Sequence, residues 1–235
     1  MSGALTAVRS DVDVLTNRQS DAVTDYAAGN LSPAKHALMA CVVETNPAIA
    51  AEAAFETDVA ASLMTDIRPV PLSPFLIGDT LEKLALSSTY ETAANDGTHS
   101  DLETRLAPKP LRDLMQGAGL RDIKWKSLIP GVAVHDVLGN RKTRTGDRMY
   151  LLRAKGGIQL PEHSHEGEEW TLILKGSYRT DTQRYFRGDL HIADETTDHA
   201  PYVEEGEDCI CLVVTQGQLH MKSWLPRLIQ QVVGI

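Results

Sequence analysis

Two histidines and a glutamate in the second half of the chain have the side chains and the spacing of a metal site. His163, His165 and Glu169 follow the pattern G-x5-H-x-H-x3-E-x6-G between Gly157 and Gly176. Imidazole nitrogens and carboxylate oxygens are ligands that divalent transition metals take. Residues two apart on an extended strand lie on the same face, so His163 and His165 project together and Glu169 can join them. The pattern predicts that these three side chains bind a metal ion.

A third histidine is the expected fourth ligand. His199 stands before Ala200 and Pro201, and proline restricts the backbone there to extended conformations. It follows a strand that carries a turn at Gly188 and Asp189. If two strands face each other across the mouth of a barrel, His199 can reach the other three ligands and complete a set of three nitrogens and one oxygen. The alternative is that His199 is an ordinary polar residue near a turn.

The segment that carries these residues, from about Trp125 to Leu219, resembles a cupin, a small antiparallel barrel of two sheets. Its first motif matches the cupin pattern in full. The second departs from it, because the usual P-x-G is missing, with only Arg187, Gly188 and Asp189 there, and Val203 stands where an asparagine is common. The resemblance implies one divalent metal on the four residues above, with zinc as the expected ion and iron, manganese or nickel as alternatives.

More narrowly, PEHSHEGEEWTLILKGSYRTD and the strands after it resemble the ChrR-type cupins, which form the C-terminal half of an anti-sigma factor. DYAAGNLS, from Asp25 to Ser32, resembles the start of the sigma-binding helical domain of that family. The resemblance implies that residues 20–86 bind an extracytoplasmic-function sigma factor. It also implies a transcription regulator rather than an enzyme, in which the cupin responds to oxidative stress of the singlet-oxygen type and the sigma factor is released.

The N-terminal half departs from the family at its zinc ligands. The family holds a second zinc there with an early histidine and a later H-x3-C-x2-C, whose positions fall near Val42, Asn46 and Ile49. None of these side chains binds zinc, so the N-terminal zinc is expected to be absent. His36 and Cys41 are five residues apart and lie on different faces of a helix, so we expect ordinary helix residues there, with Cys41 buried.

Two other functions stay open. Cupins with the same ligand pattern include iron dioxygenases and metal-dependent isomerases, so the site could belong to a metal-dependent enzyme. Glu162, Glu166 and Glu168 flank the ligands, but they are equally well explained as a solvated acidic edge. The third possibility is a metal-stabilised binding module with no catalytic role, since a fold does not determine a function.

Composition excludes several classes of protein. The chain has 235 residues, 42% of them hydrophobic, a net charge of −9 and three cysteines. An acidic chain has no basic patch for phosphates, so we expect no direct binding to nucleic acid. Three cysteines make no paired disulfide framework, and Cys209 and Cys211, on one face of an apolar strand, are expected to be buried thiols. No signal peptide or membrane span is apparent, which predicts a cytoplasmic protein without a membrane partner.

The expected fold class is α+β with two domains. Residues 1–86 should form a small helical domain, 87–108 a linker, and 109–235 an all-β cupin of the jelly-roll type. Capping residues and apolar periodicity predict helices at Pro33–Thr45, at 47 to about 66, at 76–87 and at Leu111–Leu120. From Ile123 onward the apolar period is two, which predicts the strands of the barrel.

Several further residues have an expected place. An apolar stripe on the second helix is either core or partly a partner surface; it comprises Ile49, Ala53, Val59, Leu63 and Met64. Trp170 should point away from Glu169 and pack in the barrel wall. His135, His191 and His220 are expected to be surface or hydrogen-bonded core residues rather than metal ligands.

Overall fold

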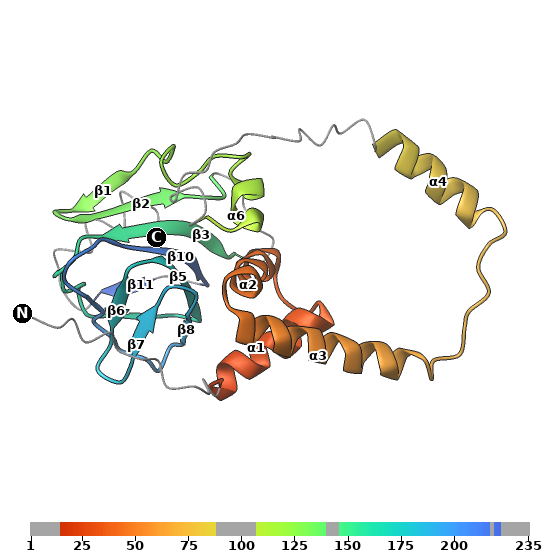
Figure 1. Cartoon of the computed structure of the whole chain (residues 1–235), viewed down its shortest axis with the longest axis horizontal. Helices are drawn as coiled ribbons and strands as arrows, with labels where there is room; N and C mark the ends of the chain where they lie inside the picture. The colour runs from red at the N-terminus through yellow and green to blue at the C-terminus, as the bar shows by residue number, and fades with distance from the viewer. Residues whose placement is uncertain (1–14, 88–106, 140–145, 217–218, 222–235) are drawn as a thin grey trace, which may run out of the picture.

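The computed structural model describes residues 15–87, 107–139, 146–216 and 219–221 (Figure 1). For residues 84–87, 165 and 219–221 it describes the backbone only. The predicted linker at 87–108 therefore lies almost entirely outside the described residues. Helices make up the first part of the described chain and antiparallel strands the second, which confirms the α+β fold class.

Three helices pack together at the start of the described chain: α1 (Asn17–Ala28), α2 (Pro33–Thr45) and α3 (Pro47–Met64). The bounds of α2 agree with the sequence prediction, because Ser32 caps its first turn and Pro33 occupies the first helical position. Asn46 ends α2 and caps α3 by accepting from the backbone N–H groups of Ala48 and Ile49. Helix α1 was not predicted, although Thr16 and Gln19 form a capping box at its start.

Two further helices follow in the described part of the chain. Helix α4 (Leu76–Ser87) has the predicted bounds, whereas α6 (Lys109–Leu114) begins two residues before the predicted helix and ends six residues before its predicted end at Leu120. The early end has a backbone cause. Gln116 and Gly117 have φ angles of 58° and 87°, in the left-handed region that ends a right-handed helix.

The strands form a large sheet and two small ones, and every pairing between strands is antiparallel. The large sheet has the order β1-β2-β3-β10-β5-β8, with bounds Lys126–Ile129, Val132–Asp136, Arg148–Ala154, Cys209–Thr215, Glu169–Lys175 and Leu190–Ala193. One small sheet pairs β11 (Leu219–Met221) with β4 (His163–His165). The other has the order β7-β6-β9, with bounds Arg184–Phe186, Ser177–Arg179 and Tyr202–Val203. Figure 1 shows the small sheets facing the large one, as in a double-sheet barrel.

The large sheet has two buried faces. Along β10, Leu212 and Val214 belong to a core shared with the helices, whereas Cys211 and Val213 belong to a second core inside the barrel. This alternation follows from the pleat of a strand, in which successive side chains point to opposite faces. Strand β10 is buried along its whole length, because one face meets the helices and the other meets the barrel interior.

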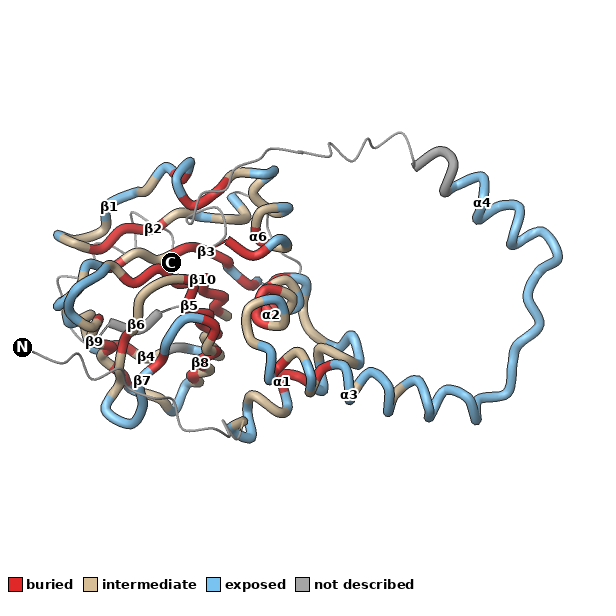
Figure 2. Tube along the Cα trace, viewed as in Figure 1, coloured by how far each residue is buried: buried red, intermediate tan, exposed pale blue. Residues whose placement is uncertain are grey.

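Helices α1 to α3 therefore share a core with the outer face of the sheet, as the buried tubes in Figure 2 show. Val23 of α1, Leu38 and Val42 of α2, and Ile49 of α3 all belong to this core. The helical segment is stabilised by apolar packing against the barrel. The division of the chain at 86 and 109 stays a prediction.

The end of α3, the segment after it and the start of α4 are exposed and extend away from the barrel (Figure 2). Large apolar side chains are exposed along this stretch: Phe55, Val59, Leu63, Met64, Ile67, Val70, Leu72, Phe75, Leu76, Ile77 and Leu81. Within the described ranges, no single helix has the length and apolarity to cross a membrane. Helices α2 and α3 meet those criteria only when taken together as a pair bent by 117°.

Candidate metal centre

Two of the predicted ligands face each other because their backbones pair. His163 and His199 form an isolated antiparallel bridge, in which each backbone N–H donates to the carbonyl of the other at 3.1 and 3.2 Å. Directly opposed residues of an antiparallel pair carry their side chains on the same face. Both side chains lie in the interior, with 8% and 6% of their surface exposed.

The two imidazoles meet through their Nε2 atoms. The distance between these atoms is 2.9 Å, and the ring planes are 75° apart. His163 Nδ1 lies 2.8 Å from the carbonyl oxygen of Pro161, which can only accept. The proton of a neutral His163 is therefore on Nδ1, and the Nε2 lone pair points toward His199.

Glu169 completes the cluster from the first position of β5. Its Oε1 atom is 3.8 Å from His199 Nε2, and the Thr171 hydroxyl donates to the same oxygen at 3.5 Å. The Glu169 side chain is 12% exposed. One ligand atom from each of His163, Glu169 and His199 lies within 4.8 Å of the others. Three of the four predicted ligands thus converge in the barrel.

For His165, the fourth predicted ligand, the structure describes the backbone only. Its backbone belongs to β4, two residues after His163, and pairs with Leu219 of β11. The position of its side chain lies outside the described part of the chain, so its role as a ligand stays a prediction.

The chemistry of the donors fits a divalent transition metal. Neutral imidazole nitrogens and a carboxylate are ligands of zinc and of other first-row metals, and a backbone carbonyl that holds the second ring nitrogen is a common support for a histidine ligand. A metal held here would supply Lewis acidity, or would stabilise the barrel by joining three separate segments.

A second aromatic group lies beside the cluster. The His191 ring stacks on Tyr185 at 4.3 Å between centroids, and its Nδ1 is 2.7 Å from the hydroxyl of Tyr178. The centroid of His191 is 5.5 Å from that of His199. Burial raises the pKa of Tyr178 well above its usual value, so this phenol stays protonated. His191 is thus a hydrogen-bonded interior residue, as predicted.

Buried thiols line the same interior. Cys209 and Cys211 are buried on β10, with their sulfur atoms 3.6 Å apart, and both are free cysteines. The contact with Cys209 and burial raise the pKa of Cys211 well above its usual value. The prediction of buried thiols on one strand face is confirmed, and so is the burial of Cys41 in α2.

The other histidines do not join the cluster within the described residues. His135 of β2 has its Nδ1 3.3 Å from the carbonyl oxygen of Lys124. His36 of α2 is exposed and lies against Tyr26, with 4.7 Å between the ring centroids. The side chain of His220 lies outside the described residues.

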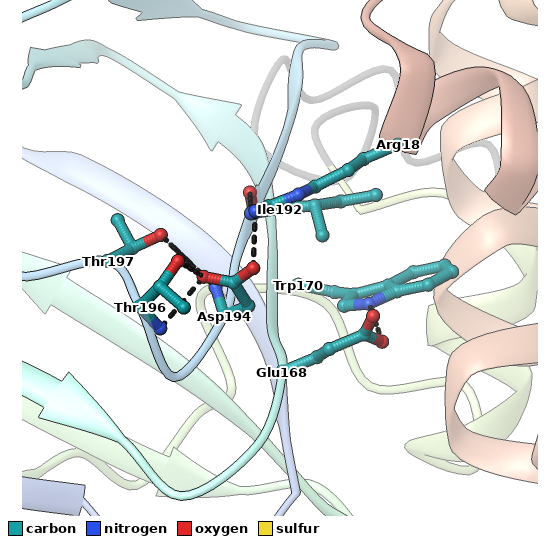
Figure 3. A network of polar contacts seen from close by, with 7 residues as sticks. All are labelled: Arg18, Glu168, Trp170, Ile192, Asp194, Thr196 and Thr197. Atoms are coloured by element: carbon teal, nitrogen blue, oxygen red, sulfur yellow. Dashed lines mark hydrogen bonds and ion pairs between the residues drawn. The ribbon is translucent and has the colours of Figure 1, made fainter.

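Glu168 fits the alternative of a solvated acidic edge only in part, because 42% of its side chain is exposed but its carboxylate also pairs with a helix. Lys35 of α2 donates to its Oε2 atom at 2.5 Å, and the indole N–H of Trp170 donates to the same oxygen at 3.0 Å. Figure 3 shows Glu168 and Trp170 side by side, next to the helices. Burial opposes the ionisation of Glu168, but the bonds from Lys35 and Trp170 outweigh it and lower its pKa.

Trp170 points away from the metal cluster, as expected, but its surroundings differ from a simple barrel wall. It belongs to the core shared with the helices, and the Lys35 ammonium lies 4.9 Å from the centroid of its ring. The sequence held one indication of this contact. Lys35 is a single cation among the apolar residues of PAKHALMACVV, and a buried cation needs an anionic or aromatic partner.

The barrel matches a known family model. Residues 116–220 match the model described as the ChrR cupin-like domain. The match includes all four predicted ligands and both small sheets except Met221, the last residue of β11.

Two comparisons extend over the helices as well. The chain is 36% identical over 214 residues to the anti-sigma-E factor ChrR of Cereibacter sphaeroides. The aligned residues cover 90% of this chain and 94% of that protein. The crystal structure of Rhodobacter sphaeroides SigE in complex with the anti-sigma ChrR matches with 32% identity and a TM-score of 0.68, over 84% of this chain and 96% of that one. The similarity extends over both the helices and the barrel and is high enough to assign a family. The chain therefore belongs to the ChrR family of anti-sigma factors.

Proposed function

We propose that this protein is an anti-sigma factor that holds an extracytoplasmic-function sigma factor inactive through residues 20–86. The observation that supports this most strongly is the 36% identity to the anti-sigma-E factor ChrR over 90% of the chain. That identity extends beyond the barrel and includes the helices. The related solved structure is a complex of ChrR with SigE.

The surface of the helical segment supports the proposal. The end of α3 and the start of α4 expose a row of large apolar side chains that includes Phe55, Leu63, Met64 and Leu81. Contiguous exposed apolar surface is a common feature of protein interaction sites. The stripe on α3 thus divides into a buried half, which packs against the protein's own core, and an exposed half suited to a partner.

The barrel is proposed to bind one divalent metal through His163, His165, Glu169 and His199, with zinc as the expected ion. The N-terminal zinc of the family is proposed to be absent. Val42 and Ile49, which stand near its ligand positions, are fully buried apolar residues, and Asn46 caps α3. Apolar packing takes the place of a metal in this part of the fold.

The proposed signal is oxidative stress of the singlet-oxygen type, as in the family resemblance, and the proposed location is the cytoplasm. Release of a bound partner requires that the signal favours one of two states of the regulator. We propose no direct contact with nucleic acid, because a chain with a net charge of −9 is repelled by phosphates.

The test is co-purification of the full chain with any sigma factor that is encoded beside it. Leu63→Asp combined with Met64→Asp should weaken the complex at least about tenfold, because charges replace central apolar contacts. Phe186→Asp is the control, since it places one such charge at an exposed apolar side chain of the barrel. Equal binding by both variants, or no binding by the unmodified chain, would refute the proposed partner surface.

A metal-dependent cupin enzyme, a dioxygenase or isomerase, is the second candidate. The observation in its favour is His191, an imidazole that is hydrogen-bonded to Tyr178 and lies beside the metal cluster, since histidine is the most common general acid or base. Oxygen uptake that depends on added iron and on a diketone substrate would support the enzyme. No oxygen uptake by the iron-loaded protein would exclude the dioxygenase.

A further inference from the structure

Strands β5 and β8 present opposite faces to the metal cluster and to the helices. In β5, Glu169 and Thr171 point into the barrel, whereas Trp170 and Leu172, which alternate with them, belong to the core shared with the helices. In β8, which pairs with β5, His191 is hydrogen-bonded inside the barrel and Leu190 belongs to the outer core. A shift of either strand therefore moves residues on both faces at once.

The helices hold these two strands and the residues beside them with side-chain contacts. Arg18 of α1 forms an ion pair with Asp194, directly after β8, and donates to the carbonyl of Ile192 (Figure 3). Gln19 donates to the carbonyl of Leu190 at 2.6 Å. Together with the Lys35 contact to Glu168, which precedes β5, these bonds connect α1 and α2 to both strands.

The end of α2 also lies against the turn before β8. Asn46 donates to the carbonyl of Gly188 at 3.1 Å. A Cβ atom added at Gly188 would lie 3.0 Å from the carbonyl oxygen of Thr45, so the two backbones are in close contact. Position 188 accommodates α2 in part because it has no side chain.

Lys35 is the most buried of the helix residues that make these contacts. The residue is 8% exposed, its ammonium donates to Glu168, and it also lies over the Trp170 ring. Glu168 and Trp170 are the two chain neighbours of Glu169. Lys35 thus contacts the residues on both sides of a predicted metal ligand, on the face of the strand opposite to that ligand.

The docking at α1 is less tightly packed. A cavity of about 330 Å³ lies between the first turn of α1 and the barrel, with Arg18 and Gln19 on one side and Tyr185 and His191 on the other. The helix is held here by a few polar contacts across a gap, which is the kind of interface that can loosen without unfolding the barrel.

We infer that the docking of α1 and α2 on the barrel and the binding of metal inside it are energetically coupled through β5 and β8, with the Lys35–Glu168–Trp170 contact as the principal link. The inference rests on the proposed metal site. Through this coupling, a change at the metal site changes how tightly the helical segment is docked on the barrel. Because such coupling is reciprocal, loosening the helices weakens the metal site by the same factor by which metal loss loosens the helices.

The first experiment measures zinc affinity by competition with a chelator, with the full chain and no sigma factor. Lys35→Met keeps the length of an apolar stem and removes the charge. It should lower the zinc affinity at least about fivefold, the lower end of typical couplings between sites. Lys109→Met is the control, since it removes an exposed lysine that pairs with Asp113 within α6.

A second variant covers the case in which Lys35→Met does not fold. Arg18 is half-exposed, and Arg18→Gln breaks the pair with Asp194 without creating a cavity. It should lower zinc affinity in the same direction by a smaller factor. If both variants bind zinc within about twofold of the unmodified chain, the inference is wrong.

The reciprocal experiment measures amide hydrogen exchange with zinc bound and after chelation. Exchange in α1 and α2 should increase on chelation, whereas exchange in α4, whose residues 76–83 are exposed, should not change. Unchanged exchange in α1 and α2 would also overturn the inference. A chain that binds no zinc at all would refute the metal site itself, and sigma binding is measured separately, so each failure can be distinguished.

Discussion

The two halves of helix α3 have similar apolar composition and opposite surroundings. Ile49 and Ala53 in the first half are 1% and 5% exposed, whereas Leu63 and Met64 in the last turn are 68% and 67% exposed. The first half packs against α1 and α2, and the second half extends beyond them (Figure 2). Apolar residues at helical spacing therefore show that a face will be covered, but not whether the cover is the same chain or another protein.

The largest expected difference between buried and exposed apolar residues is in folding stability. Leu38→Ala in α2 should lower the free energy of unfolding by about 2–5 kcal/mol, because it leaves a cavity in the core shared by helices and sheet. Leu63→Ala at the exposed end of α3 should change it by less than about 0.5 kcal/mol. Urea unfolding of both variants measures this. Similar losses would mean that the exposed half of α3 is packed in solution.

Thiol reactivity gives a second measure of the same contrast. Burial raises the pKa of Cys41 to about 12, which lowers its thiolate fraction more than about a thousandfold below that of an ordinary cysteine. The folded chain should therefore react very slowly with an aromatic disulfide reagent, whereas an Ala61→Cys variant should release one equivalent at once. Fast reaction of the unmodified chain would contradict the buried positions of its cysteines.

Alanine substitutions at two glycines distinguish the cost of backbone strain from the cost of disturbing the docking of α2. Gly29 and Gly188 have φ angles of 72° and 87°, so alanine at either costs about 1–2 kcal/mol of strain. A Cβ atom at Gly29 meets nothing, whereas at Gly188 it meets the backbone of Thr45. Gly188→Ala should therefore destabilise the protein more than Gly29→Ala in thermal unfolding. Equal losses would show that α2 can shift without cost.

The smallest expected effect concerns the ion pair between α1 and β8. Hydrogen bonds from Thr196, then from Thr197, and the charge of Arg18 lower the pKa of Asp194. A lowered folded-state pKa adds stability above the unfolded pKa of about 3.9, and this stability is lost as pH falls through the folded value. Asp194→Asn should cost less than about 1 kcal/mol at pH 7 and still less at pH 3, as measured by urea unfolding. A larger cost at pH 3 would contradict this assignment.

Most of the fold could be predicted from local signals. Helix α2 begins at the Ser32–Pro33 pair and ends at Asn46 as expected, because caps and proline act within one turn. The alternation of apolar residues after Ile123 indicated a barrel, and the antiparallel sheets confirm it. Helix α1 was missed, since its capping box precedes only a short apolar pattern.

The metal cluster was predictable in part for a similar reason. His163 and Glu169 belong to one local motif, and the strand period relates their directions. His199 comes from a distant segment, and only its backbone pairing with His163 places it in the cluster. The partners of Glu168 could not be predicted. The local sequence around a carboxylate next to a strand is the same whether the carboxylate faces water or a buried lysine.

By itself, the sequence determined the helices of the first half, the alternating strands of the second and the donor atoms suited to a metal, because these depend on contacts within a few residues. The tertiary structure decided which apolar face is covered, which acid meets Lys35 and which histidine meets His163. Those outcomes depend on the pairing of segments far apart in the chain, and side-chain type alone does not specify that pairing.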